Sequence, residues 1–271
     1  MRYINIQEVC ASISREVTDT LDNKQQQVVA GNDEIKEHLI DNGNATWRQV
    51  KPFFEDASNR KCWYTESKNP GCPNDVDHFR PAAKKLDSNG NIDYWYWFLA
   101  FDPENYRLSC NFPNRPTRNP IIGLTGGKWQ EFPLINGQIH ATTKEGIAAE
   151  RPVLLDPCNE EDCKLLEFQP DGRPVVAAIH NNDVTICERV EKSKLLLNLD
   201  FPTFNEDREI LYNKIRKLVK RGDRHHQQSN PALEEVKHDL RELMAAEQQY
   251  SKAAECYIRC FRNRDWIEEL L

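Results

Sequence analysis

The first part of the chain alternates apolar and polar positions with the spacing of α-helices. Its apolar residues recur every three or four positions, which places them on one face of a helix. These residues are Ile13, Val17, Leu21, Ile35, Leu39 and Ile40. A polar run at 25–27 interrupts the pattern, and Asn42-Gly43-Asn44 predicts a turn. We therefore expect residues 1–60 to form a helical amino-terminal segment.

The last part of the chain carries the same helical spacing in longer stretches. One apolar stripe runs through 211–219, and another predicts a single long helix from Leu233 to Phe261. One neighbouring helix would not cover the whole second stripe, so we expect this stripe to dock on a partner protein. Before these stripes, Asp171-Gly172 separates two apolar stretches and predicts a β-hairpin. Residues 166–271 are thus expected to form a hairpin and a helical region for partner docking.

Between these parts, residues 61–165 lose the helical spacing and become rich in Pro, Gly, Asn, Cys and aromatic residues. Such a composition is typical of a loop-rich segment that places side chains for chemistry. A short strand is predicted over 106–109, and we expect the aromatic run 94–101 to be core rather than a base-stacking platform. The predicted fold class is α+β, with a loop-rich core flanked by helical amino- and carboxy-terminal regions.

The composition argues against several classes of protein. The chain has 271 residues, of which 39% are hydrophobic, and no stretch approaches the roughly 20 apolar residues that a membrane helix needs. The first residues, Met1-Arg2-Tyr3-Ile4, do not resemble the apolar core of a secretory signal peptide. We therefore expect a cytoplasmic protein without membrane association, whose nine cysteines are reduced thiols or metal ligands.

The chain is acidic overall and basic in one place. It has 36 Lys and Arg residues against 43 Asp and Glu residues, and the formal net charge of −7 argues against a surface covered by nucleic acid. One helical face nevertheless carries a basic cluster, made of Lys214, Lys217, Arg221 and Arg224. This basic cluster is either a site for a phosphate backbone or a solvated helix face, and the sequence favours neither.

The residues with the clearest chemistry lie in the middle segment. Asp77 and His78 place a carboxylate, which can bind a metal, beside an imidazole whose pKa is near neutrality. Asn105 comes immediately before the predicted strand, and Asn114 follows it after a turn that begins with Cys110. An imidazole can take a proton from water, and carboxylate and amide oxygens are ligands that Mg²⁺ accepts.

This order of residues resembles the HNH, or ββα-metal, nuclease motif. Further segments are similar to the HNH endonucleases of antiphage defence, namely the retron-associated HNH proteins and the nuclease subunit of Septu-type systems. These segments are Asp77–Pro81, Tyr94–Ala100, Phe132–Leu134, Glu150–Cys158, Phe168–Gly172 and Leu195–Asp200 with Arg208. The resemblance covers roughly residues 60–215. It implies a ββα-metal core and a metal-dependent endonuclease that hydrolyses phosphodiester bonds as the effector subunit of a defence complex.

The resemblance also implies a role for each residue of the motif. His78 is the general base, and Asp77 with Asn114 holds Mg²⁺ or Mn²⁺. Asn105 is assigned to the catalytic site, where it fixes the loop that carries His78 by backbone hydrogen bonds. Asn111 is a neighbouring alternative to Asn114 as the metal ligand.

Other charged residues near the motif are candidates for the substrate or the metal. Arg80 and Arg115 are expected to hold substrate phosphate, because a guanidinium matches two phosphate oxygens at once. Glu150 and Asp156 either stabilise the fold or flank the metal, and the sequence leaves both possibilities open.

Many proteins of this type carry Cys-x-x-Cys twice and bind a structural zinc ion with the four thiolates. Here Thr65 and Pro113 stand at the second position of each pair, after Cys62 and Cys110. Two thiolates are too few for a closed tetrahedral site, so we do not expect a structural zinc ion. We expect packed aromatic side chains to hold the loops instead.

The resemblance implies an ATPase partner of the Septu type and, for the retron-associated proteins, a reverse transcriptase with its RNA–DNA hybrid. DNA is the expected nucleic acid substrate ahead of RNA. Two other functions stay open, namely a ribonuclease with a tRNA-type substrate and a degenerate, non-catalytic adaptor subunit. A product with a 2′,3′-cyclic phosphate would indicate a ribonuclease, whereas the intact Asp77-His78 pair argues against an adaptor.

Overall fold

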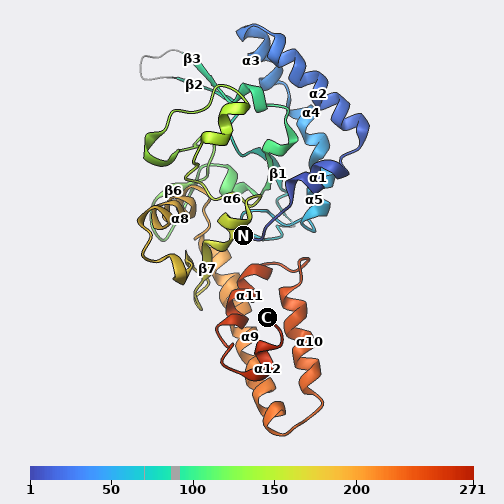
Figure 1. Cartoon of the computed structure of the whole chain (residues 1–271), viewed down its shortest axis with the longest axis vertical. Coiled ribbons are helices and arrows are strands. Elements are labelled where there is room, and N and C mark those ends of the chain that lie inside the picture. Colours follow the sequence, from blue (N-terminus) through green and yellow to red (C-terminus); the bar gives the residue numbers. More distant parts are fainter. Residues whose placement is uncertain (70, 87–91) are drawn as a thin grey trace.

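The chain forms an elongated molecule with a mixed upper part and a helical lower part (Figure 1). The computed structural model describes residues 1–69, 71–86 and 92–271. In the upper part, helices surround several two-stranded sheets, while the lower part consists of helices beside the long helix α9 (Pro202–Gln227). Within the described residues, no helix is both long and apolar enough to cross a membrane. Helices together with small sheets agree with the predicted α+β class.

The amino-terminal segment is helical, as its apolar spacing predicts. Its helices are α1 (Ile6–Ser12), α2 (Arg15–Ala30), α3 (Asp33–Asp41), α4 (Asn44–Trp47) and α5 (Lys51–Ala57). The side chains of Asn5, Ser14 and Asn32 accept hydrogen bonds from the first turns of α1, α2 and α3. Because Ser14 caps a new helix, Ile13 lies between two helices rather than within one continuous stripe.

An antiparallel ribbon packs against these helices. Strand β1 (Asp75–His78) pairs with β4 (Tyr106–Ser109), which sets Asp77 opposite Arg107 and His78 opposite Tyr106. The four-residue helix α6 (Asn111–Asn114) follows β4 directly. Every residue of β4 is buried, so the predicted strand over 106–109 is confirmed. Tyr106 and Leu108 share a core with residues of the amino-terminal helices, and this core supports the ribbon from behind.

Further two-stranded ribbons complete the upper part. They are β2 (Ala83–Leu86) with β3 (Ile92–Trp95), β5 (Thr117–Arg118) with β6 (Thr125–Gly126), and β7 (Leu166–Phe168) with β8 (Pro174–Val176). The short helix α7 (Glu160–Lys164) precedes β7. The predicted hairpin around Asp171-Gly172 is confirmed, and Gly172 takes the left-handed conformation, with φ of 83°.

The aromatic run is core over the residues that can be assessed. Tyr96, Phe98 and Phe101 are buried, which agrees with the expectation that this run packs inward. The side chain of Tyr94 lies outside the described part of the structure.

The lower part is a bundle of helices. Helix α8 (Val184–Leu196) ends in the upper part, and α9 runs from there into the lower part (Figure 1). Beside α9 lie α10 (Leu233–Met244), α11 (Ser251–Arg259) and α12 (Asp265–Glu268). Their shared core contains Ile215 and Val219 of α9 together with Val236, Leu240, Ala254, Tyr257 and Ile258.

The prediction of one long helix from Leu233 to Phe261 is wrong. The helix ends at Met244 and a new one starts at Ser251, with Tyr250 between them at φ of 56°. The buried amino group of Lys61 donates to the carbonyls of Ala246 and Gln248, which removes both from any helical ladder. The apolar stripe is covered by α9, so it is not the partner surface that the sequence suggested.

The break in this helix also joins the lower part to the upper part. The buried carboxylate of Glu66 accepts from Ser251 Oγ at 2.9 Å and from the backbone N–H of Lys252 at 3.2 Å, in the first turn of α11. A carboxylate at a helix amino terminus is favoured by the helix dipole. The turn that contains Lys61 and Glu66 is therefore one of the contacts, besides α9, that hold the two parts together.

The close contact between α9 and α12 gives a test of the lower core. Gly222 is buried in α9, and a Cβ there would overlap the ring of Trp266. We expect Gly222→Ala to lower the free energy of unfolding by about 1–3 kcal/mol through overpacking, although alanine favours a helix over glycine by about 1 kcal/mol. Urea unfolding measures this. Gly71→Ala, where a Cβ meets nothing, is the matched control, and an unchanged midpoint for Gly222→Ala would contradict the packing described here.

Candidate active site

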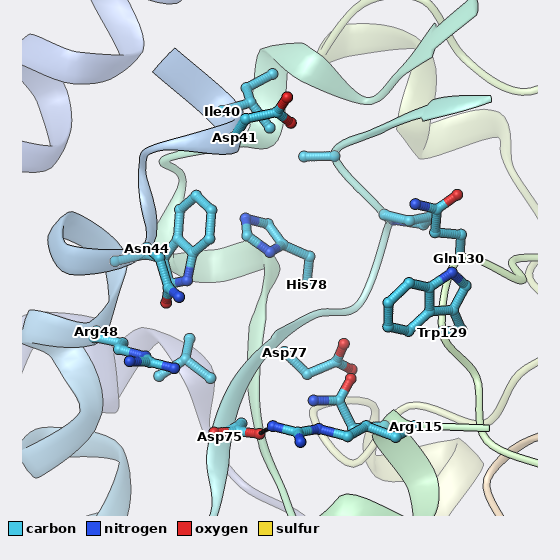
Figure 2. A pocket seen from close by; sticks show the side chains of 15 residues that line it. Ile40, Asp41, Asn44, Arg48, Asp75, Asp77, His78, Arg115, Trp129 and Gln130 are labelled. Atoms are coloured by element: carbon cyan, nitrogen blue, oxygen red, sulfur yellow. Dashed lines mark hydrogen bonds and ion pairs between the residues drawn. The ribbon is translucent and has the colours of Figure 1, made fainter. Parts of the chain in front are cut away.

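A cleft of about 680 Å³ opens where the ribbon, the amino-terminal helices and the segment after α6 meet. Its lining residues are Ile40, Asp41, Asn44, Trp47, Arg48, Asp75, Val76, Asp77, His78, Pro81, Ala82, Asn114, Arg115, Trp129 and Gln130. Figure 2 shows Asp77 and His78 in the middle, with Asn44 and Arg48 on one side and Trp129 and Gln130 on the other. The cleft thus brings together four predicted site residues, which are Asp77, His78, Asn114 and Arg115.

His78 is held in one orientation by a backbone carbonyl. Its Nε2 lies 2.8 Å from the carbonyl oxygen of Ala100. A carbonyl oxygen can only accept, so Nε2 carries the proton and Nδ1 keeps the lone pair of the neutral ring. The rings of Trp47 and Tyr106 stand edge-on to the imidazole, with centroids 4.8 and 4.9 Å away. Burial lowers the pKa of His78 below its usual value, which favours the neutral form.

Asn105 fixes the backbone immediately after His78. Its side-chain oxygen accepts from the N–H of Arg80 at 2.9 Å, and its amide group donates to the carbonyl of Arg80 at 2.9 Å. Its own carbonyl accepts from the N–H of Phe79. Asn105 is buried and does not line the cleft, so it is a positioning residue rather than a group that touches substrate.

Asp77 is paired with a lysine that the sequence did not single out. Lys128 Nζ lies 3.1 Å from Asp77 Oδ1 and 2.7 Å from the carbonyl oxygen of His78. The phenol of Tyr64 donates to Asp77 Oδ2 at 3.2 Å. Lys128 is fully buried and Asp77 nearly so. Lys128 follows two glycines and belongs to no recognisable motif, so the sequence gave no sign of its pairing with Asp77.

The donors in the cleft fit a hard divalent cation. Asp77 and Asn114 offer carboxylate and amide oxygens, and each oxygen of Asp77 accepts one hydrogen bond and retains further acceptor capacity. Within the described residues, no group of three or more His, Cys, Asp or Glu side chains is arranged to hold a metal. A cation such as Mg²⁺, which keeps several waters and needs few protein ligands, therefore suits this site better than Zn²⁺.

The structure separates the two asparagines that the sequence left as alternatives. Asn114 lines the cleft, and its carbonyl accepts from the backbone N–H of Trp129 at 3.1 Å. The side-chain amide of Asn111 instead donates to Cys72 Sγ at 2.7 Å. Of the two, Asn114 is the one placed with Asp77.

The two candidate phosphate ligands lie in different places. Arg115 lines the cleft, is about half exposed, and pairs with Asp75 at 2.8 Å (Figure 2). Arg80 pairs with the buried carboxylate of Glu150 at 2.8 Å and lines a separate cleft of about 580 Å³. The expectation that Arg80 accompanies His78 at the substrate is therefore corrected, because the charge of Glu150 holds this guanidinium elsewhere.

Glu150 and Asp156 stabilise the fold. Glu150 accepts from the phenol of Tyr96 at 2.6 Å and from the N–H of Ala141 at 2.8 Å, in addition to Arg80. Asp156 accepts two hydrogen bonds from the guanidinium of Arg107, both at 2.7 Å. Neither carboxylate lines the cleft of His78, so both belong to the scaffold.

Cys62 and Cys110 are the two cysteines left from the four-thiolate pattern, and both lie inside the protein. Cys62 and Cys110 are both fully buried, and Thr65 Oγ1 lies 3.9 Å from Cys110 Sγ. All nine cysteines are free thiols. The packing of Trp63 and Tyr64, which are also buried, supports this turn.

The basic cluster lies on the outside of α9. Lys214, Lys217 and Arg224 are exposed and line a shallow groove, while Arg221 pairs with Asp239 at 2.7 Å. This placement is compatible with both a phosphate-binding face and a solvated helix face.

Comparison with known proteins gives one informative similarity. This chain is similar to a Septu protein. It is 29% identical over 126 residues to the Septu protein PtuB of Bacillus mycoides (strain KBAB4), which is 45% of this chain and 39% of that protein. The match thus spans about two fifths of the length of its relative, and no family model matches. It supports the Septu-type resemblance noted in the sequence.

The buried ion pair beneath the cleft can be tested directly. Removing one partner of such a pair leaves an uncompensated buried charge, so we expect Lys128→Met to lower the free energy of unfolding by about 3–5 kcal/mol. The double variant Asp77→Asn with Lys128→Met is the matched control and should recover much of the loss. Urea unfolding of both variants measures this, and a loss below about 1 kcal/mol for Lys128→Met would argue that the pair contributes nothing.

Proposed function

We propose that this protein is a metal-dependent HNH-type endonuclease that hydrolyses phosphodiester bonds. The observation that carries the proposal is the orientation of His78, whose Nε2 is occupied by the carbonyl of Ala100. This contact leaves Nδ1 as a base in a cleft that also holds Asp77 and Asn114. The order of β1, β4 and the four-residue helix α6 along the chain is a further observation that supports the proposal.

The chain's own residues divide the work of hydrolysis. Nδ1 of His78 accepts the proton of the attacking water, while the Ala100 carbonyl keeps the ring in place. Asp77 and Asn114 would hold a divalent cation, which when bound neutralises charge on the phosphoryl group and the leaving oxygen. Arg115 at the edge of the cleft is available to a phosphate oxygen. Asn105 holds the backbone of Arg80 and so keeps the end of β1, which carries His78, in place.

The similarity to PtuB supports a Septu-type defence role. The matched relative is a Septu protein, and we infer that this chain acts in antiphage defence together with a partner, for which a Septu-type ATPase is the candidate. The expected partner surface has to lie outside the stripe in α10 and α11, because α9 covers it.

Loss of the base is the direct test of the proposed activity. We expect His78→Ala to reduce cleavage of nucleic acid in the presence of Mg²⁺ or Mn²⁺ by at least about 10²–10⁴-fold, the range for a missing general base, without loss of folding. Plasmid DNA and total RNA, incubated with the protein and its genomic neighbours, provide the assay. His180→Ala, at a half-buried histidine that does not line the cleft, is the matched control. Cleavage by His78→Ala at the control's rate would exclude His78 from the mechanism.

The chemistry of the product ends separates the nuclease classes. Attack by water activated at His78 should leave a 5′-phosphate and a 3′-hydroxyl end. The alternative function, a ribonuclease with a tRNA-type substrate, would use the same imidazole to deprotonate a 2′-hydroxyl and leave a 2′,3′-cyclic phosphate. End-labelling and mass spectrometry of the products decide between them, and complete absence of cleavage by the assembled complex would favour the adaptor.

A further inference from the structure

Trp129 is an exposed tryptophan at the edge of the candidate active site. Its side chain is 58% exposed, whereas Trp63 and Trp266 are buried. It lines the same cleft as Asp77 and His78, and Figure 2 shows its indole facing the space beside them, above Arg115. An exposed aromatic ring at the edge of a cleft, close to the proposed general base His78, is placed to contact a nucleobase of the substrate.

The backbone of Trp129 is held in an unfavourable conformation. Its φ is 46°, in the left-handed region that bulky residues avoid. Such a conformation persists only where the surroundings enforce it, and such residues cluster at functional sites. The surroundings here are specific. The N–H of Trp129 donates to the carbonyl of Asn114 at 3.1 Å, and the N–H of Lys128 donates to Pro113 at 2.6 Å.

The neighbouring lysine anchors the same turn from the other side. Lys128 Nζ reaches the carbonyl of Trp129 at 3.4 Å as well as Asp77 and His78. The turn is therefore bonded to both α6 and β1, the two elements that carry the candidate metal ligands and the base. Its geometry directs the ammonium inward and leaves the indole in the cleft.

The charges of the cleft favour a contact with the substrate that does not depend on charge. The ionised side chains that line it are Asp41, Asp75, Asp77, Arg48 and Arg115. Before a metal ion binds, they give no surplus of positive charge, so these side chains by themselves do not attract a phosphate backbone. A flat indole can bind a base through its face, and this interaction is tolerant of sequence because every base has such a face.

We propose that Trp129 stacks on a nucleobase next to the scissile phosphate, so that the cleft binds a nucleic acid strand with an unpaired, unstacked base. This inference rests on the proposed nuclease function and narrows its substrate to single-stranded segments or to duplexes with a displaced base. Arg115, beside the indole, contacts the phosphate of the same nucleotide. Trp129 is thus a substrate-positioning residue.

Binding to strands with and without bases tests the proposal. The full-length His78→Ala protein, which should bind without cleaving, is titrated into fluorescent oligothymidylate and into an abasic strand with the same number of phosphates. We expect it to prefer oligothymidylate. Adding Trp129→Ala should lower the oligothymidylate affinity roughly 5- to 150-fold, the range for one stacked base, with the abasic affinity unchanged. Trp129→Tyr should keep the preference, and a paired oligothymidylate–oligoadenylate duplex should bind more weakly than the single strand.

Two controls separate stacking from a structural role. Ile121→Ala removes another exposed apolar side chain, outside the cleft, and should leave both affinities unchanged. Trp129→Gly should lose the base preference but unfold at a urea midpoint at or above that of the wild type, because glycine adopts positive φ without penalty. A lower midpoint for Trp129→Gly would assign the indole to the fold.

The remaining outcomes distinguish this inference from the proposed function. Equal affinity for both strands, or an equal loss for both on Trp129→Ala, overturns the stacking role even if the wild type cleaves nucleic acid. Selective binding that depends on Trp129, without cleavage by the assembled wild-type complex, supports the stacking role and overturns the nuclease.

Discussion

The candidate active site depends on one buried ammonium group. Lys128 Nζ binds the carboxylate of Asp77 and the carbonyl of His78, and both residues belong to β1. Burying two charges is costly unless they are paired and hydrogen-bonded. The ion pair offsets this desolvation cost only while Lys128 and the carboxylate of Asp77 stay in contact. The turn that contains Lys128 and the end of β1 are therefore held together as one unit. Their relative placement is then a property of the fold rather than of the bound substrate.

A second set of buried charged side chains, in the turn 61–67, joins the upper part of the molecule to the lower part. By resemblance, this turn would carry thiolates of a zinc site, yet Thr65 stands in place of one cysteine. Lys61 instead binds the segment between α10 and α11, and Glu66 binds the first turn of α11. The N–H of Trp63 donates to the carbonyl of Leu108 in β4. A small loop-rich core needs such support. The helical lower part therefore contributes to the stability of the ribbon that carries Asp77 and His78.

Local patterns were predictable from the sequence, and long-range pairings were not. The hairpin at Asp171-Gly172 and the strand at 106–109 follow from turn residues and apolar spacing, which act over a few positions. The break between α10 and α11 depends on Lys61, which is remote in the sequence, so the apolar stripe alone suggested a continuous helix. The prediction that Arg80 holds substrate phosphate failed for the same reason. Its ion-pair partner Glu150 lies far along the chain, and the sequence did not reveal the pair. The family resemblance implied one site for Asp77, His78 and Asn114, which do line one cleft, but it gave no sign of Lys128.

The charge distribution bears on how such a site would be used. A chain with a net charge of −7, and a cleft whose side chains give no surplus of positive charge before a metal ion binds, gains little from long-range attraction to a polyanion. Affinity then has to come from short-range contacts, which in this cleft are an indole, a guanidinium and metal-binding oxygens. The exposed cations of the basic cluster sit on α9 in the lower part, away from β1 (Figure 1), so they cannot neutralise the phosphate under attack. A nuclease of this design would cleave poorly on its own and would depend on a partner to deliver the strand, which agrees with a role as one subunit of a Septu-type complex.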